Sequence, residues 1–378
     1  MMRDEDGWNA PAVLRSGTAP GEWRPTAPAF RPPMGSQWAT MEPFAMTATD
    51  QFRPAGPPAP GTAAFRQARA EVVALGDARS TVRTPQQTEI ARYWSDAVGT
   101  YAPAGHWNAI AASIVGPLRL GLSVEAELFA ELNVAMADAG IAMADAKYHY
   151  SAWRPISAIR SGDARDPPIP DWTPLLETPA HPSYVSGHSS FSGAAAAVMT
   201  AWFGNRKFTF SSASLPGVTR NFTSFQQAAE EAAASRVYGG IHFAFDNTDG
   251  LVTGRAIGSW TMGVFRRLAE DRGLILMLMG GAMGMGAGTP RMIEGYALDN
   301  LAPVTAVTVG LDGGVPITVA VDEQDLRVDD RAGPARSGAG GNQRIRKDKY
   351  VTNGGRVNRG LRQFIWPSRA HTGLIVSV

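Results

Sequence analysis

Three short segments of this chain carry side chains whose types and spacing suit the binding of a tetrahedral oxyanion. The first, KYHYSAWRPISAIR, places Lys147 and Arg154 seven residues apart and follows them with Pro155. Residues seven apart on a helix lie on nearly the same face, about 10 Å apart along its axis, so both cations can reach one anion. The proline limits how far such a helix runs. Two cations near a helix end can equally be solvated or paired with carboxylates.

The second segment, HPSYVSGHSSFSGAAAA, places Ser186, Gly187 and His188 immediately before an alanine-rich stretch that predicts a helix. A helix start offers free backbone N–H groups and a positive dipole potential, and glycine lets the main chain approach an oxyanion closely. The Ser186 hydroxyl can donate to that anion, and His188 can exchange a proton near neutral pH. The alternative is an ordinary helix cap made by Ser186 or Ser189, with an incidental histidine.

The third segment, SRVYGGIHFAFD, contains Arg236, His242 and Asp246. Two glycines are expected to end the first helix between Arg236 and His242, and Asp246 lies one helical turn after His242. A carboxylate in that position can fix the imidazole tautomer and leave the other ring nitrogen free as a ligand or nucleophile. The alternative is a surface pair on a helix.

Taken together and in this order, the three segments resemble the signature of the superfamily that contains vanadium haloperoxidases and type 2 phosphatidic acid phosphatases (PAP2). The shared pattern is Lys, six residues, Arg-Pro; then Ser-Gly-His; then Ser-Arg, five residues, His, three residues, Asp. The Pro/Trp-rich N-terminal segment and FTSFQQAAEEAAASRVYGGIHFAFDN are also similar to bacterial haloperoxidase-like proteins. The resemblance implies a mainly α-helical bundle of the haloperoxidase/PAP2 acid phosphatase type.

The resemblance also implies roles for these residues around vanadate, or around the phosphoryl group of a phosphomonoester. The oxyanion-binding residues would be Lys147, Arg154, Ser186, Gly187 and Arg236. The catalytic residues would be His188 as acid/base, His242 as axial vanadium ligand or as phosphorus nucleophile, and Asp246 as the group that orients His242.

Haloperoxidase chemistry uses vanadium as a Lewis acid that activates hydrogen peroxide toward a halide. His181 would belong to a halide pocket, because algal bromoperoxidases have histidine where the fungal chloroperoxidase has phenylalanine, which favours bromide. A histidine in a loop before a proline is the other interpretation of His181. The competing functions are a soluble acid phosphatase with a phosphohistidine intermediate and a non-catalytic oxyanion-binding protein.

Composition excludes several other classes of protein. The chain has 35 basic and 34 acidic side chains, a net charge of +1, so no global field attracts nucleic acid. It has 0 cysteines, which removes disulfides and thiolate chemistry and leaves the compartment open. The first residues do not resemble a secretory signal, and the apolar stretch 273–288 is shorter and richer in glycine than a membrane span of about 20 residues. We expect a protein without a membrane span.

The chain is expected to comprise three parts: residues 1–62, an extended Pro/Trp-rich segment; residues 63–272, the helical catalytic domain; and residues 273–378, a Gly-rich tail. Apolar periodicity predicts helices at Thr84–Ser95, Trp107–Val115, Ser123–Tyr150, Ser189–Phe203, Ser224–Tyr238 and His242–Leu268. Strand-like alternation is scarce before residue 300, and one hairpin is expected to turn at Asp312 and Gly313. Bacterial haloperoxidases carry another helical half before the Pro/Trp segment. If that half is missing here, a homodimer or partner chain could cover the exposed core, and an export signal would be missing too.

Overall fold

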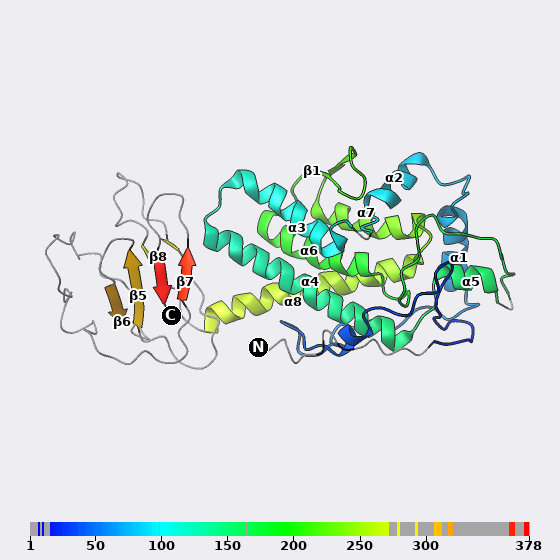
Figure 1. The fold of residues 1–378 in the computed structure, drawn as a ribbon, viewed down its shortest axis with the longest axis horizontal. Coiled ribbons are helices and arrows are strands. Elements are labelled where there is room, and N and C mark those ends of the chain that lie inside the picture. The colour runs from blue at the N-terminus through cyan, green and yellow to red at the C-terminus, as the bar shows by residue number, and fades with distance from the viewer. Residues whose placement is uncertain are drawn as a thin grey trace. The chain divides into compact units, whose positions relative to one another are not determined.

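The chain divides into two compact units, Met1–Phe265 and Arg266–Val378, in a computed structural model (Figure 1). The structure describes residues 7, 10, 16–97, 99–163 and 165–271, and beyond these only the strand residues 278–279, 292–293, 306–311, 317–320, 363–366 and 374–377. The boundaries that we expect near residues 62 and 272 stay predictions.

The first unit is built from α-helices, as the sequence predicts. The helices are α1 (Ala63–Gly76), α2 (Pro85–Tyr93), α3 (Ala102–Val115), α4 (Leu122–Tyr150), α5 (Pro155–Ser161), α6 (Gly187–Phe203), α7 (Phe225–Tyr238) and α8 (Ala244–Asp271), of which residues up to Phe265 belong to this unit. Helix α6 packs against α3, α4 and α7, and its alanines fill a core with apolar residues from the same helices. Burial of these small apolar faces, rather than helix propensity alone, holds the bundle together.

Glycines allow α6 and α8 to pack with their backbones in close approach. A Cβ added at Gly254 would lie 2.1 Å from the Ser190 carbonyl oxygen, and one added at Gly193 would lie 2.6 Å from the Leu251 carbonyl oxygen. Near the start of α6, a Cβ at Gly250 would come within 2.8 Å of the Ser186 carbonyl oxygen. The first turns of α6 and α8, which carry the second and third sequence motifs, are therefore adjacent.

The prediction that Lys147 and Arg154 share one helix is wrong. Helix α4 ends at Tyr150, where Ser151 takes a left-handed conformation with φ 45°, and Ala152 forms an isolated β-bridge with Glu22. Arg154 is the N-cap of α5, which begins at Pro155. Proline suits the first position of a helix, so here it starts a new helix rather than limiting the preceding one.

The other predicted helices are found with small changes at their ends. The helix expected from His242 begins at Ala244, so His242 lies in the loop before it. The sequence interpretation did not include α1, α5 or a short antiparallel hairpin of β1 (Phe208–Ser211) and β2 (Thr219–Phe222).

The N-terminal segment lies along α4. Within its described residues, helical structure is found only at η1 (Ser36–Thr40), a 3-10 helix that packs against α4. The buried Asp138 carboxylate of α4 accepts the backbone N–H groups of Phe44, Ala45 and Met46 at 2.7–2.8 Å. This anchors an irregular segment whose own backbone donors would otherwise be unpaired.

The second unit contains short strands. They are β3 (Leu278–Met279), β4 (Met292–Ile293), β5 (Ala306–Leu311), β6 (Ile317–Ala320), β7 (Gln363–Trp366) and β8 (Leu374–Ser377). Strands β5 and β6 pair antiparallel, as expected for the predicted hairpin, within a four-stranded sheet of order β6-β5-β8-β7, and β3 pairs with β4. The expected turn at Asp312 and Gly313 and most of the stretch 273–288 lie outside the described residues. Among the described residues, no helix has the length and apolarity to cross a membrane.

Candidate functional site

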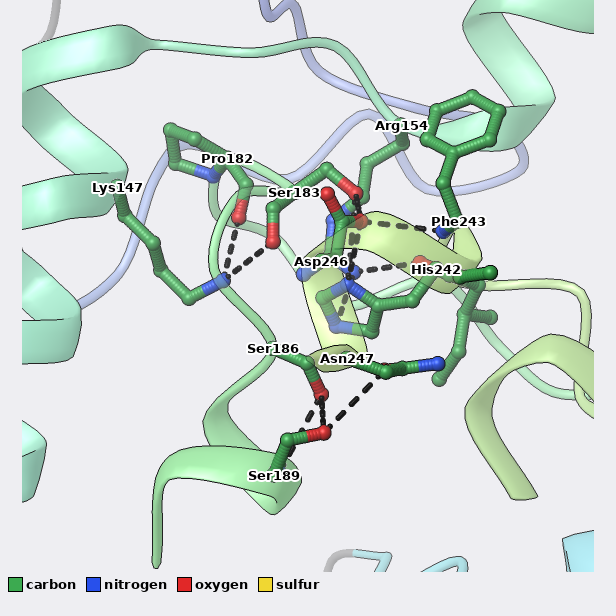
Figure 2. Close-up of polar contacts among 12 residues, drawn as sticks. Lys147, Arg154, Pro182, Ser183, Ser186, Ser189, His242, Phe243, Asp246 and Asn247 are labelled. Atoms are coloured by element: carbon green, nitrogen blue, oxygen red, sulfur yellow. Dashed lines mark hydrogen bonds and ion pairs between the residues drawn. The ribbon is translucent and has the colours of Figure 1, made fainter. Parts of the chain in front are cut away.

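The residues of the three motifs come together where α4 ends and where α6 and α8 begin. Figure 2 shows Lys147, Arg154, Ser186, His242 and Asp246 converging on one region, linked through the loop that contains Pro182 and Ser183. The backbone N–H of Ser186 donates to the Asp246 carbonyl oxygen at 2.9 Å, which fixes the starts of α6 and α8 relative to each other.

The His242 imidazole is held by the carboxylate four residues later. His242 Nδ1 lies 2.9 Å from Asp246 Oδ2, which also accepts the Ser183 hydroxyl at 2.5 Å and the Phe243 N–H at 3.1 Å. On the other side of the ring, the Arg154 guanidinium donates to His242 Nε2 at 3.0 Å. Since arginine only donates, Nε2 carries the lone pair and Nδ1 the proton. His242 therefore presents an acceptor nitrogen toward the cations.

Burial shifts the proton affinities of this pair. Burial, with the charges of Arg154 and Lys147, holds the pKa of His242 well below its ordinary value, which matches the neutral tautomer. Burial raises the pKa of Asp246 to about 6, although the Ser183 hydrogen bond and the Lys147 charge oppose the rise. Both effects follow from desolvation of the charged form.

Lys147 projects from the last turn of α4 into the same region. Its ammonium donates to the carbonyl oxygens of Pro182 and Ser183 at 2.7 and 2.9 Å, and its side chain is buried (Figure 2). An ammonium has three N–H donors, and the third has no acceptor among the described residues. Burial, together with the charge of Arg154, lowers the pKa of Lys147 well below its ordinary value.

Arg154 connects His242 to His181. Besides His242 Nε2, its guanidinium donates to the carbonyl oxygens of His181 and Ile241 at 2.8 Å and to His181 Nδ1 at 2.9 Å. Arg154 is completely buried, and burial lowers its pKa to about 9. His181 therefore borders the cations directly, and its own pKa is lowered by burial and by the charges of Lys147 and Arg154.

Ser186 and Gly187 form the start of α6. Ser186 is the N-cap, and its Oγ accepts the Ser189 N–H at 3.4 Å and the Ser189 hydroxyl at 3.0 Å. Ser186 therefore caps the helix, as the alternative interpretation expects. In this role its hydroxyl oxygen accepts hydrogen bonds, and the proton of the Ser186 hydroxyl has no acceptor within the described part of the chain. A Cβ added at Gly187 would meet only Met143, at 3.7 Å or more, so the packing of the protein does not require glycine there.

Arg236 approaches from the last turn of α7. Its guanidinium donates to the Ser235 hydroxyl at 2.8 Å and to the Trp94 carbonyl oxygen, and its exposed fraction is 1%. Its charge contributes to lowering the pKa of both His188 and His242, so it acts on both rings through space. Burial lowers the pKa of Arg236 itself to about 10. As expected, α7 ends just before Gly239 and Gly240, and the latter has φ 76°.

His188 has a carboxylate partner that the sequence interpretation did not find. Its Nε2 lies 3.4 Å from Oδ2 of Asp96, whose side chain is buried and which lies in the segment after α2. Burial and the charge of Arg236 lower the pKa of His188 to about 4, while Asp96 opposes that shift. Asp96 lies in no recognisable motif, so the sequence gives no signal for it. Ser183, which donates to Asp246, was also missed, and its only signal is its place in the HPSYVSGH segment.

The electrostatic balance of the site suits an anion. Lys147, Arg154 and Arg236 are buried, and within the described ranges the ion pairs of this site involve histidines rather than these cations. The cations donate instead to carbonyls, a hydroxyl and imidazole nitrogens. The Asp246 charge acts on Lys147 and Arg154, and the Asp96 charge acts on Arg236. Three buried cations thus face two carboxylates, and a bound oxyanion would supply the missing negative charge. The unused Lys147 and Ser186 donors and the acceptor nitrogen of His242 fit vanadate or phosphate.

Comparison with known proteins gives the same family as the motifs. A family described as the VCPO second helical-bundle domain matches residues 127–271. The vanadium chloroperoxidase of Curvularia inaequalis is 28% identical over 249 residues, covering 49% of this chain and 41% of that protein. This chain therefore matches less than half the length of that relative.

Two solved structures are similar to the fold. The crystal structure of the first bacterial vanadium-dependent iodoperoxidase has a TM-score of 0.61 and 32% sequence identity, and the match covers 69% of this chain and 64% of that one. A holo-type bacterial vanadium-dependent chloroperoxidase has a TM-score of 0.55 at 17% identity, covering 70% of each chain, and this second likeness concerns the fold alone. With its motifs, its helical fold and these relatives, the chain belongs to the superfamily of vanadium haloperoxidases and type 2 phosphatidic acid phosphatases.

Proposed function

We propose that this protein is a vanadium-dependent haloperoxidase that oxidises a halide with hydrogen peroxide. The observation that carries the proposal is the buried cationic site around His242. Burial and the charges of Arg154 and Lys147 keep the ring neutral, and the Asp246 carboxylate, which accepts from Nδ1, leaves Nε2 unprotonated. The named relatives, a chloroperoxidase and an iodoperoxidase, support the peroxidase reaction over the phosphatase reaction.

In this proposal the chain holds vanadate through residues from several elements. His242 would provide the metal ligand through Nε2, and the Arg154 donor that contacts this nitrogen would be available to the oxyanion. Lys147 and Arg236 provide further positive charge, and the Ser186 hydroxyl and Gly187 N–H provide hydrogen bonds. When bound, vanadium supplies Lewis-acid activation of hydrogen peroxide without a change of oxidation state. Preorganised donors of this kind stabilise charge without reorganising during the reaction.

His188 serves as the acid/base in this proposal. Its side chain is 17% exposed, whereas that of His242 is 4% exposed, so His188 lies on the side of the site that solvent reaches. Its lowered pKa keeps the free imidazole neutral at pH 7 and able to accept a proton from hydrogen peroxide. Asp96 stabilises the imidazolium that results.

We propose bromide as the preferred halide, with His181 as part of the halide pocket. Support comes from the contact between His181 Nδ1 and the Arg154 guanidinium at 2.9 Å, which puts this ring beside the proposed vanadate site. The homodimer remains a prediction.

The decisive experiment measures halogenation of a halogen-trapping dye by purified protein with hydrogen peroxide, with and without orthovanadate. Bromide, chloride and iodide are compared in parallel, and p-nitrophenyl phosphate hydrolysis is measured in the same preparation. Vanadate-dependent bromination supports the proposal, and faster oxidation of chloride than bromide would contradict the halide preference. Phosphate release that vanadate inhibits, without halogenation, would assign the protein to the acid phosphatases. Inactivity in both assays, with vanadate still bound, would leave a non-catalytic oxyanion-binding protein.

A further inference from the structure

His106 is a buried histidine that belongs to none of the three motifs. It lies in α3 with an exposed fraction of 0%, and its ring stacks on Trp94 with centroids 4.4 Å apart and an interplanar angle of 22°. Its Nδ1 lies 2.9 Å from Oδ1 of Asp96. Because a carboxylate accepts hydrogen bonds, Nδ1 carries a proton and donates. His106 thus contacts the carboxylate that faces His188, from the opposite side.

The two oxygens of Asp96 have different surroundings. Oδ1 accepts hydrogen bonds from His106 and from the Ser214 hydroxyl, the latter at 3.1 Å, and Ser214 Oγ also accepts the Asp96 backbone N–H at 3.1 Å. Oδ2 has no hydrogen-bond partner among the described residues and faces His188 Nε2 at 3.4 Å. The direction in which Oδ2 points is therefore set by the bonds at Oδ1.

We propose that His106 is a positioning residue for the proposed reaction: it donates to Oδ1 of Asp96 while Oδ2 faces His188, so the two histidines share one carboxylate and His106 limits how strongly that carboxylate attracts a proton to His188. The proposal rests on the proposed function in that His188 is taken to be the acid/base. The arrangement His106–Asp96–His188 extends from the aromatic core around Trp94 to the solvent-reached side of the site. It is assembled from α3, the segment after α2, and α6.

Sharing the carboxylate limits how strongly Asp96 attracts a proton to His188. Burial opposes ionisation of Asp96, yet the hydrogen bond from His106 and the contact with His188 hold its pKa below its ordinary value. The charged or titratable groups that act on His188 are Arg236, Asp96, His106 and, from the loop before α6, His181. Of these, Asp96 favours the imidazolium, while Arg236 and His106 disfavour it. When the His106 donor is lost, the Ser214 hydroxyl still holds Oδ1, so Oδ2 keeps facing His188 and more of the negative charge of Asp96 acts on that ring.

The test measures the proton affinity of His188 itself in the full chain, by following the imidazole nitrogens with NMR across about pH 4 to 8. The chain has 6 histidines, so the His188 signals are assigned by their absence from His188→Gln. His106→Leu removes the donor and keeps an apolar side chain against Trp94. His106→Asn restores an N–H near the position of Nδ1 without a titrating ring. Phe225→Leu is the matched control, since it shortens a completely buried aromatic residue in the main core that does not touch Asp96.

We expect His106→Leu to raise the pKa of His188 by about half a unit, a threefold change in proton affinity. His106→Asn should return it close to the wild-type value, and Phe225→Leu should leave it unchanged. A purely structural role would lower the melting temperature of His106→Leu, as in Phe225→Leu, without moving the His188 titration. An unchanged or lowered pKa of His188 in a folded His106→Leu would overturn the proposal. So would a rise of equal size in Phe225→Leu.

The same variants separate this proposal from the proposed function. If the wild-type protein does not oxidise halides, the haloperoxidase assignment fails, but the NMR titration still decides whether His106 acts on His188. If the wild-type protein is active, the acidic limb of its pH–rate profile should move to higher pH in His106→Leu and back in His106→Asn. A limb that stays in place in both variants would show that His106 does not act on the reacting acid/base.

Discussion

The site contains two carboxylate–histidine pairs that differ in almost every respect. His242 and Asp246 are four residues apart and join at 2.9 Å, in a pair whose side chains are 4% and 0% exposed. His188 and Asp96 lie 92 positions apart in the sequence, and Nε2 of His188 lies 3.4 Å from Oδ2 of Asp96. The His188 side chain is 17% exposed. In the first pair a single carboxylate oxygen accepts three hydrogen bonds. In the second pair the oxygen facing the ring accepts none from the residues that the structure describes.

The difference matches two kinds of task. A ring that ligates a metal must keep one tautomer and one orientation, which the donors around Asp246 Oδ2 enforce. A ring that transfers protons must change its charge, and a looser contact with Asp96 lets His188 adjust as it gains a proton. We therefore expect substitutions at the first pair to weaken oxyanion binding and substitutions at the second to slow turnover.

The largest effect is expected for His242→Ala. Removing the acceptor nitrogen that faces the cations should abolish measurable vanadate binding, which equilibrium dialysis with orthovanadate can detect. His149→Ala is the matched control, because His149 is an exposed histidine on α4, and the ring contact recorded for it is with Tyr150. Wild-type binding and halogenation in the His242 variant would overturn the assignment of the metal ligand.

The next effect is expected for His188→Ala. Vanadate affinity should stay within a few-fold of wild type, while the turnover number falls by about 10²–10⁴-fold because the acid/base is missing. Steady-state bromination at saturating orthovanadate measures the turnover number, and dialysis measures the affinity. A loss of vanadate affinity as large as that of His242→Ala would remove the functional distinction between the two pairs.

Substitution of the two carboxylates provides a sharper comparison. Asp246→Asn removes the charge that holds the His242 tautomer and should weaken vanadate binding by about 10–100-fold, the range typical of such outer partners of a metal ligand. Asp96→Asn should change binding less. It should lower the maximal turnover, because His188 becomes a weaker base, and move the acidic limb of the pH–rate profile to lower pH. Equal effects of both substitutions on vanadate affinity would contradict the separate tasks.

The contrast between the pairs also explains what the sequence could predict. His242 and Asp246 lie within one helical turn's spacing, so local geometry indicates their contact. The contact of Asp96 with His188 depends on how α3 and the segment after α2 pack against α6, and no local spacing encodes it. The same limit applies to Ser183, whose hydroxyl reaches Asp246 across 63 residues of sequence.

The fold was predictable to the extent that apolar periodicity marks helices. Long helices such as α4 and α8 follow from their sequences because many turns repeat the pattern. The break between Lys147 and Arg154 was misjudged because it depends on Ser151 adopting φ 45° and on the pairing of Ala152 with Glu22, which lies far away in the sequence. Helix α5 has only 7 residues, too few for periodicity to reveal it.

The pH dependence of stability should report the buried neutral histidines. Burial is the main cause that lowers the pKa of His188 to about 4, and it also lowers the pKa values of His181 and His242. Between the ordinary histidine pKa near 6.5 and about 4, the unfolded chain binds more protons, so stability falls as the pH falls through this window. Asp246, with its pKa raised to about 6, acts in the opposite sense, since its contribution is present at low pH and lost as pH rises through about 6.

Because three histidines oppose one carboxylate, we expect the melting temperature in vanadate- and phosphate-free buffer to fall from about pH 6.5 to 4. His188→Gln should flatten part of this dependence because glutamine does not titrate. A melting temperature that is constant or rises as the pH falls would show that these rings are not held neutral in the folded protein.

The smallest effect on the fold is expected for Gly187→Ala, at the first residue of α6, next to His188. The added Cβ has room, since its nearest protein neighbour is Met143 Sδ at 3.7 Å, and alanine favours a helix more than glycine by up to about 1 kcal/mol. The melting temperature should therefore stay level or rise slightly.

The same substitution tests whether the Gly187 N–H binds the oxyanion. If that N–H faces a bound oxyanion, the added methyl group obstructs the approach of the anion, and vanadate affinity should fall about tenfold, or ~1.4 kcal/mol. Gly116→Ala is the control, because its Cβ would meet open space at the end of α3, where we propose no ligand. Unchanged vanadate affinity in Gly187→Ala would mean that this N–H does not bind the oxyanion, and Ser186 would then be the donor that the start of α6 contributes.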